Sequence, residues 1–299
     1  FWSNLFVHRG ILFLMGTDKE HGNLIIRRSE DRGNTWSSPI DSITGLLRMG
    51  EYHTAPMPVI SYRGRIWRAV ECARSNTDIW GKRYSAMIIS APDSADLLQA
   101  ASWSVTDSLP YDSTYLDGKF GAWLEGNAVV TPDGNVADLL RVDYAPGPEY
   151  AALIRLRDSV SFDPFDPEKD FVRMPGGAKK FTVRYDSLSG RYWSLVNYVT
   201  QEWAGKQNPA WVRNTLALSS SPNLQEWTVH RTVLHHPDIA KHGFQYADWL
   251  FDGNDIVLLS RTAYDDNGTG AHNCHDANYM TFHRIKDFRK ALTEQAGNR

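Results

Sequence analysis

Two histidines stand where the sequence favours proton transfer. His53 follows an acidic–aromatic pair and precedes Ala55-Pro56, which ends a loop and starts a strand. A histidine at a loop end is expected to be exposed and to titrate near neutral pH. His21 lies in the segment 19–22, where it would stand at the mouth of a hairpin and play the same part. The alternative for both is structural: a histidine that caps a strand or lies solvated in a loop.

Tyr144 and Arg141 form a second candidate pair for chemistry. Tyr144 ends a predicted strand and precedes the loop 145–148. A tyrosine at such a rim acts as a base when a nearby cation lowers its pKa from about 10. Arg141 would supply that cation or bind the carboxylate of a substrate. The alternative is an aromatic ring that packs inside the fold.

Carboxylates offer a third chemistry. Glu125 and Asn127 alternate along one face of a predicted strand. A hydrolase with paired carboxylates would place a second acid about 5–10 Å from Glu125. Asp143 and Asp248 are the alternatives for that partner. The residues that we expect to contact the substrate are Trp123, Asn127 and Arg184.

Potential metal ligands gather near the C-terminal end: His235, His236, His242, His272, Cys274, His275 and His283. His272 and Cys274 are two residues apart, so an extended segment puts both side chains on one face. With His242 or His283 they would complete a zinc site. We therefore predict a structural zinc held by His242, His272 and Cys274. The spacing matches no standard zinc motif, and scattered loop and strand histidines are the alternative.

The length allows one large all-β domain or two small ones, and the aromatic content suits stacked sheets and sugar binding. The 299 residues are 42% apolar and include 11 Trp and 13 Tyr, whose flat faces suit pyranose rings. The net charge of −3 without long charged runs argues against nucleic acid and anionic membranes as partners. No apolar run approaches the roughly 20 residues of a membrane helix. The two cysteines, Cys72 and Cys274, allow at most one disulfide.

The elements that must position these residues repeat along the chain. In the first copy, an apolar run from Leu24 is followed by Asp31 and Gly33, which supply a turn, and by Trp36, which folds back over it. Further copies close at Trp103, Phe171, Trp227 and Phe288, about 56 to 68 residues apart. The pattern predicts a single domain, 1–299, that is an all-β propeller of four-stranded blades. Five blades are visible, and six or seven would be present if sequence is missing upstream.

The segment 29–36 fits S-x-D-x-G-x-T-W and resembles the Asp-box of sialidase-like β-propellers. An Asp-box holds a hairpin together, so it indicates architecture and not a catalytic site. A working sialidase needs three arginines around the sialate carboxylate and a Tyr–Glu pair, and neither set can be placed here. Other segments are similar to the glycan-active propellers that include ulvan lyases and rhamnosyl-glucuronate hydrolases: 51–59, 123–127, 174–181, 192–197, 243–249 and 271–278.

This resemblance implies cleavage of glycosidic bonds in polysaccharides that contain uronate and often rhamnose. Lyases of the group use a histidine and a tyrosine for proton transfer, with an arginine that neutralises the uronate. Hydrolases of the group rely on a single histidine. The resemblance also implies seven blades. Hydrolysis and β-elimination remain equal alternatives, and a non-catalytic carbohydrate-binding propeller and an exo-sialidase are the further ones.

The remaining expectations concern the setting of the protein. We expect a secreted, periplasmic or cell-surface protein, although no signal segment is visible in this sequence. We also expect a monomer whose partner is a poly- or oligosaccharide.

Overall fold

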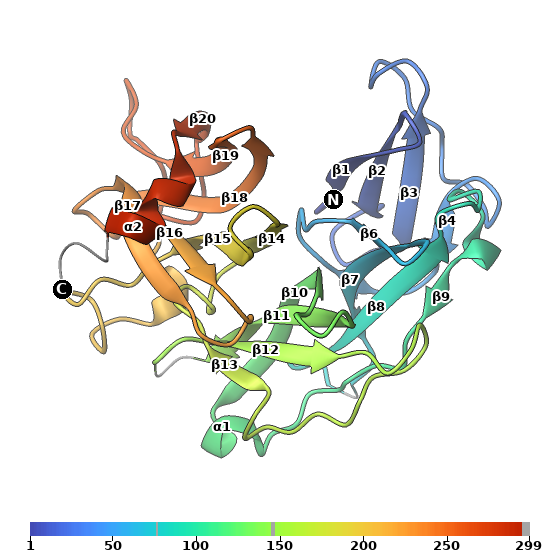
Figure 1. Cartoon of the computed structure of the whole chain (residues 1–299), viewed down its shortest axis with the longest axis horizontal. Coiled ribbons are helices and arrows are strands. Elements are labelled where there is room, and N and C mark those ends of the chain that lie inside the picture. Colours follow the sequence, from blue (N-terminus) through green and yellow to red (C-terminus); the bar gives the residue numbers. More distant parts are fainter. Residues whose placement is uncertain (76, 145–146, 295–299) are drawn as a thin grey trace. The chain divides into compact units, whose positions relative to one another are not determined.

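The computed structural model describes residues 1–75, 77–144 and 147–294. The fold is all-β, a five-bladed β-propeller with 6% of its residues in helices, as the repeats predicted (Figure 1). The helices are η1 (Ala100–Ser102), α1 (Tyr115–Gly118), η2 (Pro209–Trp211), η3 (Phe288–Lys290) and α2 (Ala291–Glu294).

The strands of the described residues form five sheets. The first contains β1 (Asn4–His8), β2 (Ile11–Thr17), β3 (Leu24–Ser29) and β4 (Leu46–Arg48). The second contains β5 (Tyr52–His53), β7 (Arg65–Ala73), β8 (Tyr84–Pro92) and β9 (Ser104–Val105), and β6 (Ile60–Tyr62) also pairs with β7. The third contains β10 (Phe120–Val130), β11 (Val136–Tyr144), β12 (Tyr150–Arg155) and β13 (Phe171–Arg173).

The fourth sheet contains β14 (Thr182–Asp186), β15 (Arg191–Asn197), β16 (Thr215–Ser221) and β17 (Thr228–His235). The fifth contains β18 (Gly243–Asp252), β19 (Asp255–Ala263) and β20 (Tyr279–Ile285). Within the described part of the chain, the fifth sheet therefore has three strands and the second has five, whereas the repeats predicted four in each.

The chain forms two compact units. The first unit holds residues 1–140 and 152–170, and the second holds residues 141–151 and those from 171 onward. None of the described helices is long and apolar enough to cross a bilayer. Cys72 and Cys274 are both free and buried.

The first hairpin shows how local chemistry produces the repeat. The Asp31 carboxylate accepts hydrogen bonds from the Ser29 hydroxyl (2.8 Å) and from the backbone N–H of Thr35 (2.8 Å). The Thr35 hydroxyl and backbone lower the pKa of Asp31 to about 2. Gly33 has a φ of +96°, which only glycine adopts without strain. The predicted turn is therefore present, and Asp31 closes it.

The three closing tryptophans occupy equivalent places, between the third and fourth main strands of their sheets. The Nε1–H groups of Trp36 and Trp227 donate to carbonyls three residues earlier, at Gly33 (3.1 Å) and Leu224 (3.0 Å). Trp103 instead donates to Leu97 O (2.9 Å). We expected all three to be buried, but only Trp103 is, because Trp36 and Trp227 lie over short turns that leave them half-exposed.

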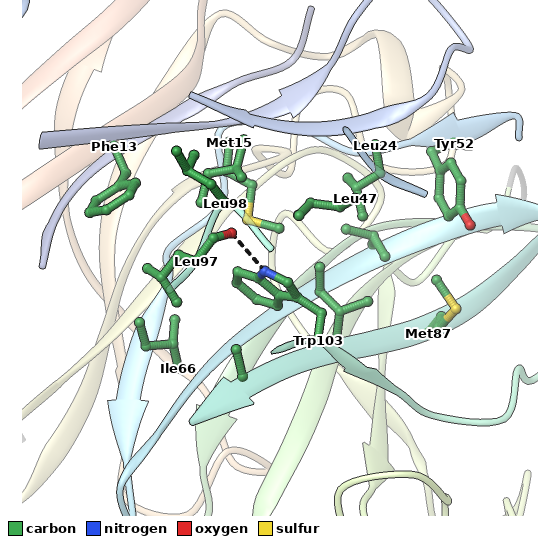
Figure 2. Close-up of a cluster of buried hydrophobic side chains, with 14 of the residues drawn as sticks. Phe13, Met15, Leu24, Leu47, Tyr52, Ile66, Met87, Leu97, Leu98 and Trp103 are labelled. Carbon is green, nitrogen blue, oxygen red and sulfur yellow. Dashed lines mark hydrogen bonds between the residues drawn. The ribbon is translucent and has the colours of Figure 1, made fainter. Parts of the chain in front are cut away.

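Trp103 reaches the core because the segment between β8 and this residue is longer than the segments that precede Trp36 and Trp227 in their sheets. Leu97 and Leu98 pack beside its ring, together with side chains from the first two sheets (Figure 2). This cluster also includes Phe13, Met15, Leu24, Leu47, Tyr52, Ile66 and Met87. The second unit has its own core, centred on Trp193, Trp249 and Phe288. Each unit is thus stabilised by a separate cluster of buried apolar side chains.

Candidate functional site

A buried histidine–carboxylate pair lies in the first unit. In the antiparallel register of β5 and β7, His53 stands directly opposite Glu71, so both side chains lie on the same face. His53 Nδ1 and Glu71 Oε2 are 3.0 Å apart. Glu71 is completely buried and His53 is 5% exposed. The carboxyl group of Glu71 therefore fixes the orientation of the imidazole.

The other oxygen of Glu71 is also held. The backbone N–H of Gly126 in β10 donates to Glu71 Oε1 (2.9 Å). Glu125 has a φ of +52°, so the strand is locally distorted where Gly126 turns its N–H toward Glu71. Contacts with protein groups at both oxygens thus fix the orientation of the Glu71 carboxyl group.

Asp138 in β11 lies on the far side of Gly126. Its side chain is completely buried, and neither carboxylate oxygen has a hydrogen-bond partner among the residues that the structure describes. Burial, with the nearby charge of Glu71 as a second cause, raises the pKa of Asp138 well above its ordinary value. The neutral, protonated form of the Asp138 carboxyl is therefore favoured.

Substitution of Asp138 by Asn is expected to remove a pH-dependent loss of stability. Because the folded-state pKa is raised, the stability contributed by this carboxyl is complete below the unfolded pKa of about 3.9 and is lost as pH rises through the folded value. Asparagine stays neutral throughout. The melting temperature of Asp138→Asn minus that of the natural chain should therefore grow as the pH rises above about 4. If the melting temperatures of the two proteins change in parallel with pH, folding does not raise the pKa of Asp138.

Gly126→Ala is expected to destabilise the first unit. A Cβ at this position would lie 2.2 Å from Asp138 Oδ1 and 2.6 Å from Oδ2. Overpacking of this kind costs about 1–3 kcal/mol of unfolding free energy, measurable by urea denaturation. The double variant Gly126→Ala/Asp138→Ala provides the control, because it removes the atoms that clash. If the second substitution restores nothing, the cost arises from the backbone and not from Asp138.

His21, Tyr84 and Arg83 extend the cluster. The Tyr84 hydroxyl and His21 Nδ1 are hydrogen-bonded, and Arg83 Nη2 donates to the same hydroxyl (3.3 Å). Arg83 also forms an ion pair with Glu51 (2.5 Å). Burial, and then the charges of Arg83 and His53, lower the pKa of His21, so this imidazole is neutral near pH 7. Burial raises the pKa of Tyr84, which therefore keeps its proton.

The rings of the cluster lie close together in the first unit. The centroids of His53 and Tyr84 are 5.1 Å apart, and those of His53 and His21 are 6.2 Å apart. Trp2 contacts both histidines, at 5.1 Å from His21 and 4.8 Å from His53. We expected His53 to be exposed, and this was wrong, because Trp2 and Tyr84 pack against its ring. The His53 side chain nevertheless keeps 7% of its surface exposed.

No protein-family model matches the chain, and no curated protein sequence matches it significantly. Solved glycoside hydrolases share its fold. A family 117 glycoside hydrolase from Zobellia galactanivorans has a TM-score of 0.51 and 11% identity, covering 96% of this chain and 83% of that one. An α-L-arabinofuranosidase from Lactobacillus brevis has a TM-score of 0.56 and 9% identity, covering 94% and 89%. An exo-β-1,3-galactanase from Clostridium thermocellum has a TM-score of 0.54 and 11% identity, covering 95% and 58%. The chain therefore shares its β-propeller fold with these enzymes.

Three of the predicted residues of the first unit lie in its core. Trp123 has no exposed surface, and its Nε1–H donates to Pro110 O (2.9 Å). Asn127 is likewise buried, with Nδ2 donating to Leu139 O (3.2 Å). Glu125 is 3% exposed. The prediction that Trp123 and Asn127 contact a sugar is therefore corrected: β10 is covered on both faces, so alternation does not bring these side chains to solvent.

The other predicted contacts belong to the second unit. Arg141 is buried and its Nε–H donates to Ala178 O (3.0 Å). The half-buried ring of Tyr144 packs edge-on against Tyr150. Arg184 donates to Trp249 O (2.6 Å) and pairs with Asp248 (3.2 Å), so it binds β14 to β18. All three have structural partners within this unit.

The predicted zinc ligands are not brought together as a set. His242 groups with His236 and Asp265, and neither His272 nor Cys274 belongs to that group. His272 is exposed, whereas Cys274 is buried with its Sγ donating to Trp211 O (3.3 Å). Burial raises the pKa of the Cys274 thiol, which disfavours the thiolate that a metal requires.

The sequence analysis missed Glu71, Asp138, Tyr84 and Arg83. One signal could have found the two acids: each interrupts an apolar strand, in RIWRAVECA and in VADLL. An ionisable residue inside a buried strand is rare unless it has a specific partner or role. Nothing in the sequence could have paired Tyr84 with His21, because 63 residues separate them.

Proposed function

We propose that this protein is a carbohydrate-active enzyme that cleaves glycosidic bonds, with His53 as its proton-transfer group. One observation carries the proposal: Glu71 holds Nδ1 of His53, while 7% of the His53 side chain remains exposed. A carboxylate at the far nitrogen orients an imidazole and stabilises the charge it acquires, as a proton-transferring histidine requires. The fold shared with glycoside hydrolases supports the same reaction class.

His53 and His21 suit opposite roles in this reaction. Protonated His53, stabilised by Glu71, would donate a proton from Nε2 to the glycosidic oxygen as the bond to the leaving sugar breaks. Neutral His21 would accept the proton of the attacking water. For that role its Nδ1–H donates to the Tyr84 oxygen, so that Nε2 carries the lone pair. The carboxyl groups of Glu71 and Asp138 have no exposed surface, so a mechanism with two carboxyls against the sugar is not supported.

The proposed substrate is a polysaccharide that contains uronate and rhamnose. Arg83 supports this choice, because its side chain is 21% exposed beside the histidines and its guanidinium fits a planar carboxylate. A uronate would compete with Glu51 for Arg83. Trp2 adds a half-exposed aromatic face suited to the C–H face of a sugar.

β-Elimination is the second candidate, and Arg83 favours it. Removal of the proton next to a uronate carboxylate needs a nearby cation, a base and an acid, and Arg83, His21 and His53 provide this set. Elimination breaks the glycosidic bond without water and leaves an unsaturated uronate, whereas hydrolysis adds water across the bond.

One assay distinguishes the two reactions. The protein is incubated with ulvan and, for comparison, with arabinogalactan, and both reducing ends and ultraviolet absorbance are recorded. Hydrolysis releases reducing ends without absorbance, and elimination releases both. Glu71→Gln, which lacks the negative charge beside His53, should lower either signal. If neither glycan is cleaved but one binds, the protein is a carbohydrate-binding propeller and the proposal fails.

A further inference from the structure

A second cluster of chemically capable side chains lies in the second unit. His236 and His242 come from the segment between β17 and β18, and Asp265 follows β19. The two imidazole rings are stacked, with centroids 3.5 Å apart and planes at 15°. One potential ligand atom from each of the three residues lies within 4.8 Å of the others. Two loops that are distant in sequence thus converge on one point.

The contacts of His242 resemble those of a histidine that binds a metal ion: a carboxylate holds one ring nitrogen and the other makes no hydrogen bond. His242 is 5% exposed, and its Nδ1 lies 2.7 Å from Asp238 Oδ2. Nε2 lies 3.5 Å from Asp265 Oδ1, and it makes no hydrogen bond within the part of the chain that the structure describes. A buried nitrogen without a hydrogen bond is costly, so this atom indicates a ligand.

Asp238 also orients the second histidine. Its backbone N–H donates to His236 Nδ1 (3.1 Å), so this nitrogen carries a lone pair, which a metal ion would take over from that hydrogen bond. Neutral imidazoles are the form that coordinates metal ions. The carboxylate on His242 Nδ1 matches the outer-shell partner that fixes the tautomer of a metal-bound histidine.

We propose that His236, His242 and Asp265 bind a divalent transition-metal cation, with zinc as the best fit. Two imidazoles and one carboxylate favour zinc over calcium or magnesium, which prefer all-oxygen sites. Metal–ligand bonds of about 2.0–2.2 Å require the three ligand atoms to approach one another more closely. Asp265 can supply this movement, because its side chain is 76% exposed. Water would occupy the fourth position.

The test is zinc titration of the full chain after dialysis against a chelator. Calorimetry should show one zinc ion bound per chain, with a higher melting temperature in its presence. Asp265→Asn and His242→Ala should each lower the affinity at least tenfold. The exposed position of Asp265 means that its variant should fold even if that of His242 does not.

Two further variants complete the experiment. His235→Ala is the matched control: it changes a neighbouring histidine whose Nδ1 bonds the Thr215 hydroxyl (2.9 Å), and it should leave zinc affinity unchanged. Cys274→Ser should also have no effect, and the cobalt-substituted protein should lack a thiolate charge-transfer band. The proposal is overturned if the chain binds no zinc, if Asp265→Asn binds it as well as the natural chain, or if Cys274→Ser abolishes binding.

Discussion

Substitution of His53 by Asn is expected to lower turnover about 100-fold or more. The Asn amide nitrogen can occupy the place of Nδ1 and still donate to Glu71, but the variant has no equivalent of Nε2. General acid–base groups typically contribute a factor of 10²–10⁴ to the rate. Loss of the nitrogen that transfers the proton should therefore lower kcat by a factor of at least about 100. The measurement is kcat on the cleaved glycan, together with its dependence on pH.

His8→Asn is the matched control for this variant. His8 also lies in the first unit and also bonds a polar group, with Nε2 2.8 Å from Asp93 O, but it lies in β1 outside the cluster. Its substitution should leave kcat unchanged. Because His53 is buried, His53→Asn should also lower the melting temperature modestly, and activity must be compared where both proteins are folded. Full activity of folded His53→Asn would shift the role of proton donor to His21.

Trp103→Ala is expected to produce the largest loss of stability, about 3–5 kcal/mol of unfolding free energy. The ring is 7% exposed and is surrounded by side chains of the first unit's core (Figure 2). Truncation removes these contacts, leaves a cavity and strands the Leu97 carbonyl that Nε1–H satisfies. Urea denaturation followed by circular dichroism provides the measurement.

Trp36→Ala tests whether burial or the repeat position determines this loss. Trp36 occupies the equivalent place in the first sheet and makes the equivalent kind of hydrogen bond, but it is only half-buried. Its substitution should cost less than half as much as that of Trp103. Equal losses for the two variants would mean that the turn itself, and not the core contact, stabilises each hairpin.

The fold could be predicted from the sequence because its signals are local. An apolar β-branched run, an Asp–Gly turn and a closing tryptophan lie within about 13 residues in the first repeat, and each acts on its immediate neighbours. The structure confirms the five sheets and the equivalent places of Trp36, Trp103 and Trp227. The three strands that the described residues form in the fifth sheet, instead of four, were not predictable, because pairing at a sheet edge depends on which segment lies beside it.

The candidate site was only partly visible. The sequence indicated His53 and His21 by residue type and loop position, but it gave the wrong exposure for His53. Burial there depends on Trp2 and Tyr84, which come from other parts of the chain. The same limitation explains why the predicted exposure of Trp123 and Asn127 differs from their burial in the structure. Alternation along a strand predicts two faces, but it does not say whether a second layer covers the outer face.

Residue types and local spacing therefore determined the strands, the turns and the chemical repertoire of this protein. Tertiary structure alone decided which of these groups act together. It set Glu71 opposite His53 through the register of β5 and β7, placed Asp138 against Gly126, and joined His242 to Asp265 instead of Cys274. These are long-range pairings, and each is selected by the packing of whole sheets. No interaction between near neighbours in the chain encodes them.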